Sequence, residues 1–260
     1  MMFADNIVLI DETKEGVERK LKLWRHTLEI RGFRLSRSKT EYLRCLLSNA
    51  AGSRSTKVGS IIFDGNVVEG STFFRYLRSI IQKDGELDGD VAHKIKAGWL
   101  KWKSVTEFFC GKDMRNRLKG KFYRTAIRPV LLYGSECWAV KHCHIQKMSV
   151  AGMRMLRWMC GHTRKYRLRN EFIREKVKVA PIEDKMMENR LKLFGHVRRR
   201  PMDAPVRRLE TWGTEKVARG KGRPKLTWLR VIEHDMRLLG LNEEMVTERA
   251  QWREMIHVDF

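Results

Sequence analysis

The residues most suggestive of chemistry lie near the N-terminus, where Asp5 and Asn6 separate Phe3 from an apolar run that starts at Ile7. Polar residues between two apolar runs predict a strand, a tight turn and a second strand, with the polar side chains at the tip. Carboxylate oxygens at such a tip could hold Mg²⁺ against a substrate phosphate. The alternative is structural, because Asp and Asn also favour turns for backbone reasons alone.

A larger group of candidate residues is cationic. Beyond residue 88, lysines and arginines recur at helical spacing and alternate with the aromatic residues Trp99, Trp102, Phe122 and Tyr123. Cations on one helix face can neutralise the phosphates of a duplex while aromatic side chains hold the opposite face in the core. Base stacking by the aromatic residues is the alternative role. The candidate nucleic-acid contacts of this region are Lys94, Lys101, Lys103, Arg117, Lys119, Lys121 and Arg124.

A second group of cations lies in residues 218–225, whose composition is typical of a linker. Its candidate nucleic-acid contacts are Arg219, Lys221 and Arg223. Arg223 stands between Gly222 and Pro224, close to the motif in which an extended Gly-Arg-Pro places an arginine in a narrow A·T minor groove. A flexible basic loop before a helix is the alternative.

Cysteines and histidines lie near one another in the middle of the chain and raise the question of zinc. No pair of cysteines has the two-residue spacing of a zinc site, so small buried thiols are the alternative. Five cysteines without a secretory signal indicate reduced thiols and an intracellular protein, nuclear or cytoplasmic, that is not secreted. The candidates for a zinc site are Cys137, His142, Cys143, His144, Cys160 and His162.

Composition limits the class of protein that can carry these residues. The 260 residues include 54 Lys and Arg against 31 Asp and Glu, a net charge of +23, yet 42% are hydrophobic. The chain is therefore too apolar for a disordered polycation, and it has no run long enough to span a membrane. Residues 1–90 carry 15 basic and 13 acidic side chains, whereas residues 91–260 carry 39 and 18. Such a surplus predicts a polyanionic partner, with nucleic acid favoured over an acidic membrane surface.

Two kinds of element must position the candidates, and together they predict an α+β fold that is predominantly helical. In residues 1–88 we expect a small antiparallel β portion, with strands at 7–10, 59–63, 66–68 and 74–81 and a helix that carries Val17, Leu21, Trp24 and Leu28 on one face. Asp11 or Thr13 would cap this helix and Gly32 would end it. The Asp64-Gly65 pair predicts a hairpin turn. Helical periodicity then predicts a basic helical region at 89–200, a loop at 201–225 and helices at 226–260.

The order of motifs along the chain resembles the later palm, thumb and C-terminal region of a reverse transcriptase from a plant-type LINE, that is, a non-LTR retrotransposon. The resemblance covers essentially the whole chain and rests on the co-occurrence of its motifs. They include Phe3-Ala4-Asp5-Asn6, Gly32-Phe33-Arg34-Leu35-Ser36, Phe74-Arg75-Tyr76-Leu77, Lys119-Gly120-Lys121-Phe122-Tyr123, Leu132-Tyr133-Gly134-Ser135, Arg190-Leu191-Lys192-Leu193-Phe194-Gly195-His196 and Gly222-Arg223-Pro224-Lys225-Leu226.

The resemblance implies roles for several residues. Asp5 and Asn6 fall on the two metal-binding aspartates of RNA-directed DNA polymerase, and Asn6 offers one neutral oxygen where the family has a carboxylate. Lys39 could assist the leaving pyrophosphate, and the alternative is an exposed lysine without a catalytic role in a lysine-rich chain. Arg75 and Arg78 belong to a segment like the hairpin that grips the primer, with Arg78 where the family often has glycine. Mg²⁺, the cofactor of the family, would be weakly bound or absent.

In the family, the fingers and an earlier palm strand with a further metal-binding aspartate precede the Phe3-Ala4-Asp5-Asn6 motif, and this sequence has no counterpart to them. We therefore expect a remnant that retains binding of RNA, DNA or their hybrid but does not polymerise alone, even after Asn6→Asp. The missing upstream half of a reverse transcriptase is a possible partner. The alternatives are a non-enzymatic nucleic-acid-binding protein and a pseudogene product without activity.

Overall fold

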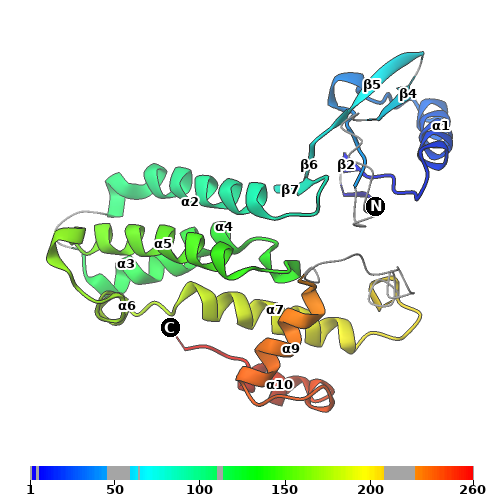
Figure 1. Cartoon of the computed structure of the whole chain (residues 1–260). Helices are drawn as coiled ribbons and strands as arrows, with labels where there is room; N and C mark the ends of the chain where they lie inside the picture. Colours follow the sequence, from blue (N-terminus) through cyan, green and yellow to red (C-terminus); the bar gives the residue numbers. More distant parts are fainter. Residues whose placement is uncertain are drawn as a thin grey trace, which may run out of the picture. The chain divides into compact units, whose positions relative to one another are not determined.

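The computed structural model describes residues 2–3, 6–45, 59–63, 65–109, 114–207 and 226–259. The chain divides into two compact units, Met1–Gly89 and Asp90–Phe260 (Figure 1). Strands occur in the first unit and helices make up most of the second, which confirms an α+β fold that is predominantly helical. The subdivision of the second unit after residues 200 and 225 stays a prediction.

The first unit contains one long helix and several short strands. Its helix α1 begins after Thr13, whose Oγ1 accepts a hydrogen bond from the Gly16 amide, and Gly32 follows its end with a φ of +81°. Both observations confirm the expected start and end of the helix. The bounds are β1 Met2–Phe3, β2 Asn6–Ile7, α1 Lys14–Ile30, η1 Arg37–Lys39, β3 Tyr42–Leu43, β4 Ser60–Phe63, β5 Asn66–Ser71, β6 Phe73–Tyr76 and β7 Ser79–Gln82.

A three-stranded sheet in the order β3-β5-β4 builds the core of this unit. Strands β4 and β5 pair antiparallel with Phe63 opposite Asn66, which confirms the hairpin expected around Asp64 and Gly65, although Asp64 itself lies outside the described residues. Strand β3 runs parallel to β5. Ile61 and Phe63 of β4 are buried with Leu21 of α1, so the sheet covers one face of that helix.

Two expected strands differ in the structure. Strand β2 ends at Ile7, so the apolar residues 8–10 that follow are not part of it. Residues 73–82 form a hairpin, β6 and β7, as the resemblance implied, and not the single strand that the local pattern predicted. The chain reverses at Leu77 and Arg78, which have φ values of 48° and 64°. Arg78 thus adopts the left-handed conformation that glycine takes most readily, at the position where the resembled family often has glycine.

The second unit consists of helices, and their apolar stripes follow the expected periodicity. Helix α5 buries Met148, Met155 and Met159, and helix α7 buries Met186 and Val197. The bounds are α2 Asp88–Phe109, α3 Asn116–Phe122, the π-helix η2 Tyr123–Ile127, α4 Arg128–Leu132, η3 Ser135–Cys137, α5 His142–Met159, η4 Arg164–Tyr166, α6 Asn170–Val177, α7 Ile182–Arg198, α9 Trp228–Leu238, η5 Glu244–Val246 and α10 Arg249–Met255.

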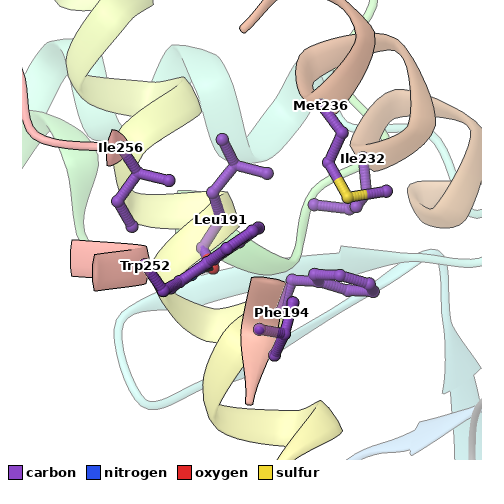
Figure 2. Close-up of a cluster of buried hydrophobic side chains, with 7 residues drawn as sticks. Leu191, Phe194, Ile232, Met236, Trp252 and Ile256 are labelled. Atoms are coloured by element: carbon purple, nitrogen blue, oxygen red, sulfur yellow. Dashed lines mark hydrogen bonds between the residues drawn. The ribbon is translucent and has the colours of Figure 1, made fainter. Parts of the chain in front are cut away.

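Helix α7 joins the last helices of the chain to the rest of the unit, because it contacts α5 as well as α9 and α10 (Figure 1). Figure 2 shows the cluster between them, in which Leu191 and Phe194 of α7 lie against Trp252 and Ile256. The indole Nε1 of Trp252 donates to the Leu191 carbonyl oxygen at 3.1 Å. The C-terminal helices therefore share a core with α7.

Candidate nucleic-acid interface

A surface hollow of about 290 Å³ lies beside α5 and is lined by three arginines, Arg154, Arg157 and Arg167. Arg154 and Arg157 are one turn apart on α5, and Arg167 belongs to the segment between η4 and α6. No carboxylate is among the residues that line this hollow. We call it the arginine hollow.

Hydrogen bonds of Arg157 hold the two sides of the arginine hollow together. Its Nη2 donates to the Leu168 carbonyl oxygen at 2.7 Å and to Asn170 Oδ1 at 2.8 Å. A guanidinium with two acceptors is fixed in orientation, since the bonds come from one planar group. Arg157 therefore shapes the site as well as adding positive charge to it.

Arg167 has a φ of 47°, which places a non-glycine residue in the left-handed region. This conformation costs roughly 1–2 kcal/mol for a residue with a Cβ. Such strain often accompanies function, because only a surrounding structure that holds the residue can maintain it. Here Leu168, the next residue, is held by Arg157.

Four of the predicted cations on α2 and α3 are exposed. Lys101 and Lys103 lie on α2, and Arg117 and Lys121 are one turn apart on α3. Their side chains are accessible to a polyanion, so they stay candidates for phosphate contacts.

Two other lysines in this set are buried, which corrects their placement on the nucleic-acid surface. Lys94 is 2% exposed, lies 4.0 Å from Asp90 and has its ammonium 4.9 Å from the centre of the Tyr133 ring. Lys119 is 7% exposed, and its Nζ donates to the Met159 carbonyl oxygen at 3.1 Å. Lys94 pairs with Asp90 of its own helix, and Lys119 binds the end of α5, so neither buried ammonium can reach a phosphate.

Arg124 has a structural contact as well. It is half-buried, and its Nη1 donates to the Lys178 carbonyl oxygen at 2.9 Å just beyond α6. Arg124 therefore connects η2 to the end of α6, and we no longer place it among the candidate phosphate contacts.

The aromatic residues of this region mostly pack. Trp102 and Tyr123 are buried at 4% and 2% exposure, as the helical spacing indicated. Trp102 meets Trp158 edge to face with ring centroids 5.7 Å apart. Trp158 itself is 53% exposed at the end of α5, so it is an aromatic face that a base could reach.

The catalytic corner expected in the first unit is described only in part. The antiparallel pairing of Phe3 with Asn6 agrees with the expected strand, turn and strand. Asp5, the proposed metal ligand, lies outside the described residues, and only the backbone of Asn6 is described. Their roles with Mg²⁺ stay predictions.

The other candidates of the first unit are exposed. Lys39 ends the short helix η1, and its amide donates to the Ser36 carbonyl oxygen. Arg75 lies on β6 with its guanidinium 5.9 Å from the centre of the Phe73 ring, and Arg78 lies at the hairpin turn. The remaining candidates, Arg219, Lys221 and Arg223, lie outside the described residues.

The cysteines and histidines do not form a metal cluster within the described part of the chain, where no group of three or more potential ligands occurs. The expectation of buried thiols is wrong for Cys137 and Cys143, which are exposed, and Cys160 is half-buried. The Nε2 of His162 lies 3.3 Å from the Nζ of Lys176. Burial, then the positive charges of Lys176 and Arg157, lower the pKa of this imidazole.

Sequence reasoning missed the three arginines of the hollow as a site. Arg154 and Arg157 are three residues apart, a spacing that places them on one face of a helix. Arg167 could not be added to them from spacing, because an irregular turn through Gly161 separates it from α5.

Among the described residues, no helix is both long and apolar enough to cross a bilayer.

Comparison with known proteins gives one relationship to report. The chain is 22% identical over 270 residues to a Caenorhabditis elegans protein described as uncharacterized and transposon-derived. The match covers 98% of this chain and 94% of the other. No protein-family model matches the chain, and no solved structure matches it significantly. Along nearly its whole length, the chain is thus similar to a protein described as derived from a transposon.

Proposed function

We propose that the chain originates from a transposable element, that it is a remnant of a LINE-type reverse transcriptase, and that it binds nucleic acid without polymerising. The full-length similarity to a transposon-derived protein supports the first part of this proposal. The reverse-transcriptase ancestry rests on the order of motifs, from Phe3-Ala4-Asp5-Asn6 to the Gly222-Arg223-Pro224 segment.

The arginine hollow is the observation that carries the binding function. Three arginines line it, and no carboxylate is among the lining residues. The hollow lies on the unit that holds most of the net positive charge, and α2 and α3 carry further exposed lysines and arginines. Guanidinium groups match phosphate geometry with paired N–H donors, so a nucleic acid backbone is the polyanion that this surface fits best.

Asn6 supports the absence of polymerase activity. A two-metal polymerase site needs carboxylates because their charge and their two oxygens each hold a divalent cation. A neutral amide at this position weakens the Coulomb attraction for Mg²⁺. The purified chain should therefore give no extended product with a primed RNA template, deoxynucleotides and Mg²⁺. Appreciable extension would contradict this part of the proposal.

Fluorescence anisotropy with labelled single-stranded RNA, single-stranded DNA and an RNA–DNA hybrid tests the binding. Neutralising about four phosphates of a single strand gives a slope near −2.8 in log affinity against log salt, or about a 20-fold loss for a threefold rise in salt. Arg154→Ala with Arg167→Ala should weaken binding and flatten the slope. The control with the same charge change is Arg230→Ala with Arg237→Ala, two exposed positions on α9. Affinity that does not change with salt would contradict the proposal.

A further inference from the structure

We infer that the arginine hollow binds one unpaired nucleotide, with its phosphate on the arginines and its base or sugar on an apolar wall. This inference rests on the proposed function and specifies the part of the nucleic acid that the site recognises. Three features of the hollow carry it: free guanidiniums, an apolar wall and a volume near the lower end of the range for small-molecule sites.

Arg154 and Arg167 supply the free guanidiniums. Both side chains are exposed, and neither has a hydrogen bond or ion pair within the described part of the chain. Arg157 uses only its Nη2 for the bonds to Leu168 and Asn170, which leaves its Nε–H and Nη1–H for a ligand. Three such groups around one hollow favour a ligand with several anionic oxygens, and a phosphate meets that requirement.

Val150, Met153 and Leu168 form the apolar part of the lining. Val150 is 40% exposed and Met153 is 8% exposed, so the wall passes from the surface into the core. Inorganic phosphate would leave these side chains in contact with water. A base or ribose would cover them and gain the free energy of burying apolar surface. The lining therefore favours a nucleotide over a bare phosphate.

The size of the hollow restricts the ligand to one unit. Its volume of about 290 Å³ is near the lower end of small-molecule sites, which range from about 300 to 1,000 Å³. A base inside a duplex cannot enter, because its faces are stacked and its edge is paired. The site therefore fits a nucleotide in single-stranded RNA or DNA, or at an unpaired end.

Competition experiments with the whole chain test the inference. A labelled single-stranded 12-mer is displaced with adenosine 5′-monophosphate, adenosine or inorganic phosphate as the competitor. We expect the monophosphate to compete at least about tenfold better than either of the other two, because only it uses both parts of the site. We also expect the single strand to bind more tightly than a duplex of the same sequence.

Variants separate the charged part of the site from the apolar part. Arg154→Ala with Arg167→Ala should weaken binding of both the monophosphate and the 12-mer by at least about tenfold. Arg154→Lys with Arg167→Lys keeps the charge and should restore only part of the affinity, because lysine lacks paired donors. Leu168→Ala should weaken binding of the monophosphate and leave binding of inorganic phosphate unchanged. The α9 pair Arg230→Ala and Arg237→Ala is the control, and thermal melting confirms that each variant is folded.

The outcomes distinguish this inference from the proposed function. The 12-mer could bind in a salt-dependent way and yet not be displaced by the monophosphate, with no loss of affinity when Arg154 and Arg167 are replaced. That result would overturn this inference and leave the proposed function standing. Equal competition by the monophosphate and inorganic phosphate would overturn the part of the inference in which a base or sugar contacts the apolar wall. Binding of the monophosphate without binding of any nucleic acid would support the site and overturn the proposed function. Failure to bind either would overturn both.

Discussion

Glu188 of α7 is a buried carboxylate that holds the end of the chain. It is 2% exposed, and its Oε2 accepts hydrogen bonds from Lys185 Nζ at 2.6 Å and from the Val258 amide at 3.2 Å. Lys192 donates to its other oxygen, and Lys185 also donates to the Val258 carbonyl oxygen. One carboxylate thus joins two turns of α7 to the C-terminal segment.

The stability of the protein should depend on pH through Glu188. Burial would raise the pKa of this carboxyl, but hydrogen bonds and charges from Lys185 and Lys192 outweigh burial and lower it. The folded state then binds the proton less readily than the unfolded state. Glu188 therefore contributes stability above its unfolded pKa of about 4.3, and this contribution is lost as the pH falls through the lower folded value.

Glu188→Gln tests this dependence. At pH 7 we expect the variant to have a free energy of unfolding about 2 kcal/mol below that of the wild type, because charge-assisted hydrogen bonds are lost. Urea unfolding at pH 7 and at pH 3 measures the difference. It should shrink in acid, where the wild-type carboxyl approaches protonation. An equal difference at both pH values would contradict the role of ionised Glu188.

Individual residues were also where sequence reasoning was least able to predict the site. Lys94 and Lys119 have the same helical context as Lys101 and Lys121, yet the first two are buried and the last two are exposed. Burial depends on which helix packs alongside. The partner of Lys119, the Met159 carbonyl oxygen, is 40 residues away in the sequence.

At the scale of elements, Gly120 allows α3 to pack closely on α6. A Cβ at this position would overlap the carbonyl oxygen of Val177, the last residue of α6. The backbone of α3 approaches the end of α6 so closely that only a hydrogen fits there. The side chain of the preceding residue, Lys119, is buried too and donates to the carbonyl oxygen of Met159 at the end of α5.

Gly120→Ala should therefore separate α3 from α6. We expect the free energy of unfolding to fall by about 1–3 kcal/mol, the usual cost of overpacking, even though alanine favours a helix more than glycine does. Lys121→Ala, an exposed change on the same helix, is the control and should alter stability by less than about 0.5 kcal/mol. Thermal or urea unfolding measures both, and equal effects would rule out the close approach.

Regular elements were predictable from local pattern, whereas one irregular reversal was not. The stripe of Val17, Leu21 and Trp24 with Thr13 before it contains the whole signal for α1, because periodicity and capping involve neighbours in sequence. The hairpin of β6 and β7 reverses at Leu77 and Arg78, neither of which has the usual preference for a positive φ. Pairing between the strands must hold that turn, so the two residues alone gave no sign of it.

At the scale of the whole molecule, a buried ion pair connects α7 to α9. The Nε of Arg190 donates a hydrogen bond to Asp235 Oδ2 at 2.8 Å. The Nη2 of Arg190 lies 2.8 Å from the same oxygen. Both side chains are nearly inaccessible, at 3% and 5% exposure. Burial raises the pKa of the Asp235 carboxyl, although the charge and hydrogen bonds of Arg190 oppose that shift.

Asp235→Ala should strongly destabilise the protein. It would leave the Arg190 guanidinium buried without its counter-charge, which typically costs about 3–5 kcal/mol in the free energy of unfolding. The double variant Arg190→Met with Asp235→Leu removes both charges and keeps apolar volume, so it should be more stable than Asp235→Ala. Urea unfolding of the three proteins measures this order, and the reverse order would contradict it.

The sequence by itself determined the fold class, most helices and the concentration of positive charge in residues 91–260. These are properties of local pattern and composition, which survive without knowledge of any long-range contact. Only the tertiary structure decided which cations are exposed and that Arg167 meets Arg154 and Arg157 in one hollow. The reason is physical: a site is set by distances between segments, and those distances depend on how helices pack and where turns bring the chain back.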